Sequence, residues 1–414
     1  MQKEYFTTSL EHILAELERI DLLIRLHAMQ ARQIHPFDDK SQEHFVPEQM
    51  VDELQPPSFG VHRRATASAS LSQNEIRNAL DQITGDIWLQ KTESKRRGIR
   101  LRLDELEALF DLTSVERDIF LICLAPELDL LYERIYAYLQ DDVTKNRPGV
   151  DLVSNLLGPS LSATLDARKY LAPEAPLCKY ALLHFCDDPS HQKSPLPNWC
   201  LKADERVVNH LLDLDIIDPY LIPHVRRGGS NSGWEDFIIP AELKHHLALM
   251  IQNRKVYHQQ GSVFYFQGPY GTAKKSTAEA LCKELGLGLL IIDLQSMLGD
   301  DRLNFEKTLR LVLREALLQH SALYWQGFDL LLAEDKCAFF TSLLLEAKEQ
   351  RGLTFLAGEK TWEPVDALKD FSSVHITFPL QNHAKQYITG VNTGLEAYES
   401  GFSFGKNRYA SVAA

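Results

Sequence analysis

The sequence predicts two dissimilar domains, a mainly helical one in the first half and an α/β one with a parallel sheet in the second. Three observations carry this prediction. Apolar residues recur at three- and four-residue spacing over residues 9–33 and again over 71–223, which is the period of amphipathic helices. From residue 262 onward, short apolar runs alternate with helical patterns, as in βαβ units. A glycine-containing loop follows the first of these runs.

Composition limits the class of protein further. The 414 residues are 44% hydrophobic and 24% charged, which is typical of a globular chain with room for two or three domains. A formal net charge of -13 repels phosphate backbones and anionic lipid, so neither nucleic acid nor a membrane is an expected partner. The charged N-terminus does not resemble a signal peptide, and no apolar window is long enough to span a bilayer. We therefore expect a cytoplasmic protein.

The cysteines suggest neither a zinc site nor a disulfide framework. No pair of them has Cys-x-x-Cys spacing, and most lie in apolar runs. We expect reduced thiols that pack as small hydrophobic side chains, and no metal ligands.

Residues 1–34 are expected to form an amphipathic helix, because Ile13, Leu17, Ile20 and Ile24 lie on one stripe. This stripe must be covered either by the chain itself or by a neighbouring subunit. Residues 35–70 are rich in proline, acidic and small residues and predict a flexible linker.

Residues 71–223 contain several helical patterns and one stretch that alternates like a strand. Thr113 followed by Glu116 predicts a capped helix start, and we expect an interruption near Pro126. The alternating stretch is APLCKYALLHFCDD. A helical domain with a small β-wing is winged-helix-like.

Winged helices often bind DNA, and this sequence has a basic cluster that would suit phosphates: Lys95, Arg96, Arg97, Arg100 and Arg102. The candidate recognition helices carry acidic residues instead, namely Glu116, Asp118, Glu127 and Asp129. A solvated, charge-balancing helix end is therefore the favoured interpretation of the basic cluster. Protein–protein docking is the favoured role, and a DNA-binding regulator is the least favoured alternative.

Residues 224–235 form a Gly/Ser-rich joint, and residues 236–380 are expected to form the α/β domain. A helix is predicted over 238–258. The predicted strands are GSVFYFQ, GLGLLIIDL, SALYWQG, GLTFLAGE and a final SVHITFPL, and the predicted helices after the glycine loop include LNFEKTLRLVLREALLQH and DKCAFFTSLLLEAKEQR.

The loop after GSVFYFQ has the spacing of a P-loop. In such a loop, backbone N–H groups converge on phosphate oxygens, a lysine reaches the β- and γ-phosphates, and the next hydroxyl binds Mg²⁺. Gly268, Gly271 and Lys274 are at the expected positions. We assign nucleotide binding to Gly268, Pro269, Tyr270, Gly271, Thr272, Ala273, Lys274, Lys275 and Ser276.

Two positions of this loop depart from the pattern. Ala273 replaces a glycine that allows close backbone approach, and Lys275 replaces the magnesium-binding hydroxyl, with Ser276 one position too late. A cationic Lys275 could supply charge to the phosphates without metal. We expect weak binding of ATP or ADP and little contribution from Mg²⁺.

The residues that should perform hydrolysis are also altered. A P-loop ATPase ends the strand written here as LYWQG in Asp, for magnesium, and Glu, to polarise water, whereas this chain has Gln326 and Gly327. Asp329 could compensate in part, although a turn-capping role is favoured. Glu359 occupies the position of a polar residue that senses the γ-phosphate, and its carboxylate would repel phosphate unless paired. No residue is assigned a catalytic role, and this module alone is not expected to hydrolyse ATP.

The order of GPYGTAKKS, LYWQG and FLAGE before a WEP turn resembles AAA+ ATPases. More narrowly, the chain is similar to the AAA+ ATPase encoded with extracellular contractile injection systems, the phage-tail-like particles that deliver protein toxins. This resemblance covers most of residues 10–380. It rests on LAELERIDLLIRL, SVERDIFLICLAPELDLLYERIYAYLQDDVTKNRPGVDL, FQGPYGTAKKSTAEALC and LTFLAGEKTWEP.

The resemblance implies a multidomain chain, with a mainly α winged-helix-like N-terminal domain followed by an α/β P-loop (AAA+-type) parallel-sheet domain. In that family a second, intact AAA+ module follows. Residues 381–414 contain neither a second P-loop nor a helical lid with an arginine sensor, so a truncated, split or naturally short homologue would each fit.

The resemblance also implies AAA+ ring subunits or injection-particle components as protein partners. The expected function is an ATPase-like scaffold or regulatory subunit in particle assembly or cargo loading. The alternative is a protein-interaction module that binds no nucleotide.

Overall fold

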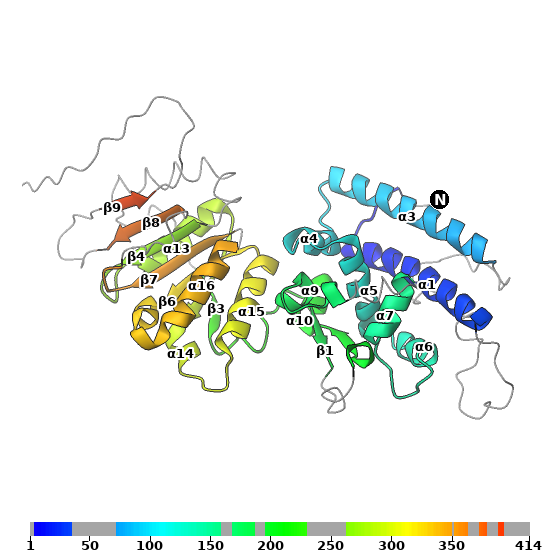
Figure 1. Cartoon of the computed structure of the whole chain (residues 1–414). Helices are drawn as coiled ribbons and strands as arrows, with labels where there is room; N and C mark the ends of the chain where they lie inside the picture. Colours follow the sequence, from blue (N-terminus) through cyan, green and yellow to red (C-terminus); the bar gives the residue numbers. More distant parts are fainter. Residues whose placement is uncertain are drawn as a thin grey trace, which may run out of the picture. The chain divides into compact units, whose positions relative to one another are not determined.

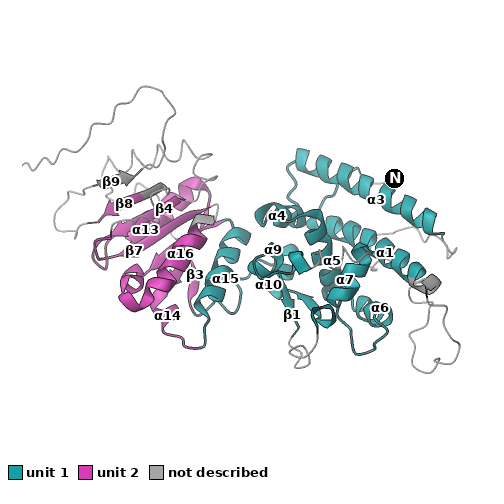
Figure 2. Ribbon diagram, in the orientation of Figure 1, with its two compact units in different colours: residues 1–223, 302–320 teal, residues 224–301, 321–414 magenta. Residues whose placement is uncertain are grey.

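The computed structural model describes residues 4–34, 72–158, 168–186, 195–229, 262–349, 352–362, 372–378 and 388–392. The chain divides into two compact units (Figure 2), of which unit 1 comprises residues 1–223 and 302–320 and unit 2 comprises 224–301 and 321–414. The linker predicted over 35–70 and the helix predicted over 238–258 lie outside the described residues.

Unit 1 is mainly helical (Figure 1). Its described elements are α1 (Ser9–Ile34), α3 (Gln73–Arg96), α4 (Arg102–Leu109), α5 (Ser114–Leu128), α6 (Leu131–Leu139), α7 (Val150–Leu157), α9 (Pro176–Lys179), β1 (Leu183–Phe185), the 3-10 helix η2 (Leu196–Asn198), β2 (Leu201–Ala203), α10 (Glu205–Leu211) and α15 (Phe305–Leu318).

The amphipathic helix predicted at the start of the chain is confirmed as α1. Its stripe, with Ile13, Leu17, Ile20 and Ile24, is completely buried and belongs to the main core of unit 1. Because α1 contacts α3, α5 and α7, the chain itself covers this stripe. The stripe therefore needs no neighbouring subunit.

Helix α5 is the central helix of unit 1, with every residue from Ile119 to Pro126 buried. It begins with the predicted cap: the Thr113 hydroxyl accepts a hydrogen bond from the Glu116 N–H, and Glu116 accepts in return from the Thr113 N–H. Because α5 lies in the core and contacts helices on several sides, it is not a groove-facing recognition helix.

The expected interruption between two helices lies slightly after Pro126, since α5 continues to Leu128 and α6 begins at Leu131. Proline lacks the N–H that would bond to the carbonyl four residues earlier, which here belongs to Ile122. The Tyr136 hydroxyl of α6 donates to that carbonyl at 2.8 Å. A side chain thus satisfies the acceptor that proline leaves free, and the helix continues.

The wing is a two-stranded antiparallel sheet of β1 and β2, in which Phe185 lies opposite Leu201. The strand expected over APLCKYALLHFCDD is shorter than predicted, because its first residues form α9. The expectation of reduced thiols alone is also wrong, since Cys186 and Cys200 form a disulfide with a Cα–Cα distance of 5.5 Å. Only the strand register, which spacing along the chain does not reveal, brings these two cysteines together.

Unit 2 is an α/β unit built on a seven-stranded sheet. Its described elements are β3 (Val225–Arg227), β4 (Ser262–Gln267), α13 (Lys274–Leu285), β5 (Gly288–Asp293), α14 (Leu294–Leu298), β6 (Ser321–Gln326), the 3-10 helices η4 (Phe328–Leu332) and η5 (Glu334–Lys336), α16 (Cys337–Glu349), β7 (Leu353–Gly358), β8 (Ser372–Thr377) and β9 (Ile388–Asn392).

The strand order is β3-β5-β6-β7-β4-β8-β9, and the five strands from β5 to β8 run parallel. This confirms the predicted parallel-sheet α/β domain. Two antiparallel edge strands were not predicted: β3 lies within the expected joint over 224–235, and β9 follows the strand expected to be the last. Both are short and carry weak hydrophobic signals in the sequence.

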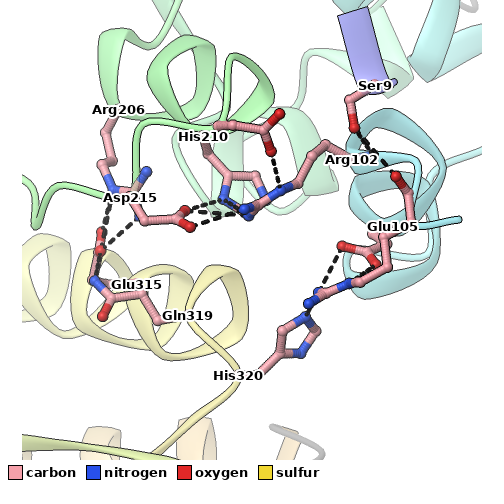
Figure 3. A network of polar contacts seen from close by, with 11 residues as sticks. Ser9, Arg102, Glu105, Arg206, His210, Asp215, Glu315, Gln319 and His320 are labelled. Atoms are coloured by element: carbon pink, nitrogen blue, oxygen red, sulfur yellow. Dashed lines mark hydrogen bonds and ion pairs between the residues drawn. The ribbon is translucent and has the colours of Figure 1, made fainter. Parts of the chain in front are cut away.

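Helix α15 connects two strands of unit 2, yet its contacts place it in unit 1. Its residues Arg314 and Glu315 are fully buried. Glu315 accepts hydrogen bonds from Arg206 at 2.9 Å and 3.0 Å, and Arg314 lies 2.6 Å from an Asp218 carboxylate oxygen (Figure 3 shows the first pair). A buried charge is stable only when paired, so these bonds fix the position of α15 in unit 1.

None of the described helices combines the length and apolar character needed to cross a membrane.

Candidate functional site

The nine residues assigned to nucleotide binding lie in the loop after β4 and in the first turn of α13. Strand β4 lies between β7 and β8, and from β4 the chain passes over two strands to form β5. The loop therefore lies at the carboxyl edge of the parallel strands, where the strand order reverses. Open α/β sheets bind their ligands at this place.

Two glycines of the loop are required for different reasons. A Cβ on Gly268 would lie 2.4 Å from the Phe378 carbonyl oxygen, so no larger residue fits between this loop and the end of β8. Gly271 has φ of 83°, a left-handed conformation that favours glycine. Ala273, by contrast, has φ of -69°, so its side chain causes no backbone strain here.

The side chain of Lys274 is folded back onto its own loop. Its Nζ donates to the carbonyl oxygens of Gly268, Pro269 and Gly358, the last two at 3.2 Å and 3.3 Å. The residue is 8% exposed. Burial lowers the pKa of Lys274, although Glu359 and Asp329 act in the opposite direction. All three ammonium hydrogens thus have acceptors within unit 2.

Lys275, which stands where a P-loop has its magnesium-binding hydroxyl, lies differently from Lys274. Lys275 is about half exposed, and its Nζ is 4.0 Å from Glu279 on the next turn of α13. This is a loose contact between an exposed ammonium and a buried carboxylate, which leaves the ammonium able to reorient. Ser276 is half-buried in the same turn.

The end of β6 carries no carboxylate. Gln326 closes this strand, and Gly327, with φ of 81°, turns the chain into η4. The Gln326 Oε1 accepts a hydrogen bond of 3.3 Å from Arg226 of the edge strand β3. Where a magnesium-dependent ATPase would place negative charge, unit 2 therefore presents an amide and a guanidinium.

Asp329 and Glu359 are both engaged by backbone N–H groups. The Asp329 carboxylate accepts from the N–H of Glu359 at 2.6 Å and of Lys360 at 3.1 Å. Glu359 Oε1 accepts from the N–H of Tyr270, in the loop before α13, at 2.9 Å. Asp329 therefore caps a neighbouring segment rather than its own turn, and Glu359 contacts the loop directly.

Aromatic rings support this edge of the sheet. Tyr265 of β4 lies against Phe328 and Trp362 with ring centroids 5.6 Å and 5.2 Å apart, and its hydroxyl donates to the Lys360 carbonyl. Packed aromatic groups of this kind hold the ends of β4 and β7 in a fixed relation.

Three features of this site could not be found from the sequence: the carbonyl contacts of Lys274, the arginine beside Gln326, and the carboxylate of Glu359 on the loop. The contacts of Lys274 with Gly358, of Arg226 with Gln326 and of Glu359 with Tyr270 join residues that are distant along the chain, and only the strand order brings these residues together. Among the described residues, no group of His, Cys, Asp and Glu side chains is placed to hold a metal ion.

The fold defines a protein with a mainly helical unit that carries a small β-wing and an α/β unit with a parallel sheet. A family model described as a variant winged helix domain matches residues 2–225, more than half of the chain. The chain therefore belongs to the family of variant winged helix domains. The predicted fold class, winged-helix and mainly helical followed by a parallel-sheet α/β domain, is confirmed.

No curated protein matches this chain. Among solved structures, the FIGL-1 AAA domain is similar at 20% identity and a TM-score of 0.33, over 41% of this chain and 63% of that domain. The same domain in complex with ADP is similar at 20% identity and a TM-score of 0.31, over 38% of this chain and 58% of that domain. A structure describing katanin self-assembly is similar at 18% identity and a TM-score of 0.31, over 40% of this chain and 61% of that one. These values indicate a partial likeness of fold and carry no argument about activity.

Proposed function

We propose that this chain is an AAA+-like subunit with a degenerate nucleotide site, which binds ATP or ADP weakly and hydrolyses little ATP alone. The observation that carries the proposal is the end of β6, where Gln326 and Gly327 stand in place of the two acidic residues. Without a carboxylate there, neither a magnesium ion nor an attacking water has its usual partner. The P-loop spacing of Gly268, Gly271 and Lys274 supports residual phosphate binding.

The biological setting follows from the sequence resemblance. We propose a cytoplasmic scaffold or regulatory role in the assembly or cargo loading of a contractile injection system. Protein partners would be AAA+ ring subunits or components of the particle. The buried charges of unit 1 pair with one another inside the unit, so they stabilise its fold and are not available for acid–base chemistry.

The proposal is tested by thermal melting of the full chain with ATP or ADP, with and without Mg²⁺. A ligand present at a hundred times its dissociation constant stabilises the native state by about 2.7 kcal/mol. We expect a rise in Tm that is similar with and without Mg²⁺. Lys274→Ala should remove this rise, whereas Lys283→Ala, at the other end of α13, should keep it.

Two outcomes would contradict the proposal. Rapid Mg²⁺-dependent turnover that Lys274→Ala abolishes would show an intact ATPase. A Tm that does not change in millimolar nucleotide would show that the loop binds none.

The second outcome would favour the alternative, a protein-interaction module that binds no nucleotide. A specific observation favours this alternative: Lys274 already has carbonyl acceptors and the Tyr270 N–H already has a carboxylate partner. In that case Lys274→Ala should leave partner binding unchanged.

A DNA-binding role has less support. In the described part of unit 1, each residue of the basic cluster pairs with a carboxylate, for example Arg97 with Glu93 at 2.7 Å and Arg100 with Glu105 at 2.6 Å. Such local pairs leave little net positive charge for phosphates. Binding to DNA that falls with salt and is lost in an Arg96→Ala, Arg97→Ala variant would restore this interpretation.

A further inference from the structure

We propose that the carboxylate of Glu359 is a built-in competitor of nucleotide phosphate: it occupies an N–H group of the P-loop and must withdraw before phosphate binds. The proposal rests on the proposed function of residues 268–276 as a phosphate cradle. It adds a regulatory contact that neither the loop pattern nor the comparisons assign.

The position of Glu359 is fixed by its backbone. Asp329 accepts hydrogen bonds from the N–H groups of Glu359 and Lys360, and the Tyr265 hydroxyl donates to the Lys360 carbonyl. Gly358 just before it has no room for a side chain, because a Cβ there would lie 2.6 Å from Asp329 Oδ1 and 2.7 Å from the Tyr265 hydroxyl. The start of the segment after β7 is therefore held on both sides, and its first side chain reaches the P-loop.

The contact places a carboxylate on the loop that would receive phosphate. Backbone N–H groups in the loop before α13 are the donors of a phosphate cradle, and Glu359 Oε1 accepts from one of them, Tyr270, at 2.9 Å. A carboxylate oxygen and a phosphate oxygen are both anionic acceptors, so they compete for this donor and also repel each other.

The same segment also holds the lysine of the loop. Lys274 donates to the carbonyl of Gly358, and Glu359 is close enough to raise the pKa of that lysine against the effect of burial. The Glu359 carboxylate thus engages the Tyr270 N–H, and the Gly358 carbonyl engages the Lys274 ammonium. Nucleotide binding requires both contacts to exchange for phosphate.

Release of the Glu359 carboxylate from the Tyr270 N–H needs only a rotation of the Glu359 side chain. Glu359 is exposed, and Tyr270 at the tip of the loop is 86% exposed, so solvent surrounds the contact on its outer side. The clamped backbone of residues 359–360 can stay in place while the carboxylate turns outward. The loop therefore has a closed state held by Glu359 and an open state that accepts phosphate.

The experiment compares wild type, Glu359→Gln and Glu334→Gln by isothermal titration with ATP, inorganic pyrophosphate and adenosine. Glu334 in η5 is also exposed, so its substitution removes the same charge elsewhere in unit 2. We expect Glu359→Gln to bind ATP and pyrophosphate about tenfold more tightly, which is the scale of one charge-assisted hydrogen bond at an exposed site. Adenosine affinity should not change, and Glu334→Gln should behave as wild type.

A second readout does not depend on ligand. Hydrogen exchange at the Tyr270 amide should be slow in wild type and faster in Glu359→Ala, which removes the acceptor oxygen that a glutamine would retain. Equal exchange in the two proteins would overturn the proposal.

The outcomes separate this inference from the proposed function. Binding by wild type with no gain in Glu359→Gln would overturn the inference and leave the proposed function standing. Binding by Glu359→Gln alone would support the inference and show that the wild-type loop is held closed. Binding by neither protein would overturn both.

Discussion

Helices α13 and α15 both carry charged residues that are shielded from solvent, but they pair them in opposite ways. On α15, Arg314 and Glu315 bond to opposite charges from residues about a hundred positions earlier in the chain. On α13, Lys274 bonds to neutral carbonyls, two of them in its own loop. A buried ion pair cannot open without exposing two uncompensated charges, whereas carbonyl contacts can exchange for a ligand. The difference distinguishes a charge that stabilises the fold from one that is available for binding.

The largest effect is expected from breaking the ion pair between Glu315 of α15 and Arg206. Glu315→Gln leaves Arg206 buried without a counter-charge, so we expect the free energy of unfolding of unit 1 to fall by about 3–5 kcal/mol. Urea unfolding measured by circular dichroism checks this. Glu174→Gln, at an exposed pair with Arg310, is the matched control and should cost less than about 1 kcal/mol.

A double variant separates loss of pairing from loss of packing. Arg206→Met with Glu315→Leu replaces both charges by apolar groups and should recover most of the stability. If stability does not recover, the hydrogen bonds between Arg206 and Glu315 themselves stabilise unit 1. The loss in Glu315→Gln would then not be due only to an unpaired buried charge.

Protonation of buried histidines gives a smaller effect on the same unit. Burial lowers the pKa of His12 to about 4, and burial together with the charge of Arg102 lowers the pKa of His210 to about 4. The unfolded chain takes up these protons near pH 6.5, whereas the native state does so only near pH 4. Stability should therefore be complete above pH 6.5 and fall as the pH decreases toward 4, by about 1–2 kcal/mol for each histidine at pH 5.

Urea midpoints at pH 8, 6 and 5 would measure this loss. His12→Gln and His210→Asn should each make the profile flatter, because the substituted residue no longer titrates. If the dependence of stability on pH is the same in both variants as in wild type, the loss does not arise from protonation of His12 and His210.

The smallest predicted effect concerns the carbonyl left free by Pro126. Tyr136→Phe removes the hydroxyl that donates to Ile122, so we expect a loss of about 1–2 kcal/mol, the cost of an unsatisfied buried acceptor. Adding Pro126→Ala should return part of that loss by restoring an N–H four residues after Ile122. Additive effects of the two substitutions, measured by urea unfolding, would show that the two sites are independent.

The sequence predicted those parts of the fold that rest on long periodic patterns. Helices α1 and α5 and strands β4 to β8 fall close to where the apolar spacing places them, because burial of a continuous stripe or run determines them. The edge strands β3 and β9 were missed, because edge strands are short and need little hydrophobic burial. The wing disulfide was missed because it depends on register.

For the candidate site, the sequence predicted which residues belong to the loop but not how they are paired. Spacing alone identified Gly268, Gly271 and Lys274, since a P-loop has a fixed local pattern. The contact between Glu359 and the Tyr270 N–H joins two loops that follow neighbouring parallel strands, β7 and β4. Such a contact becomes predictable only when the strand order is known. The assigned nucleotide-binding roles themselves stay predictions until ligand binding is measured.

Helix α15 has a consequence for any attempt to divide this protein. A cut after Pro223 would deprive Arg206, Asp204 and Asp218 of partners on one fragment and leave Arg314 and Glu315 without theirs on the other. Neither fragment would be a self-sufficient folding unit, although each contains most of one compact unit. Recombination during evolution meets the same obstacle, because α15 belongs to unit 1 but is encoded between two segments of unit 2. Unit 2 cannot be exchanged as one continuous segment without removing α15 from unit 1. The two units are therefore expected to have been inherited together.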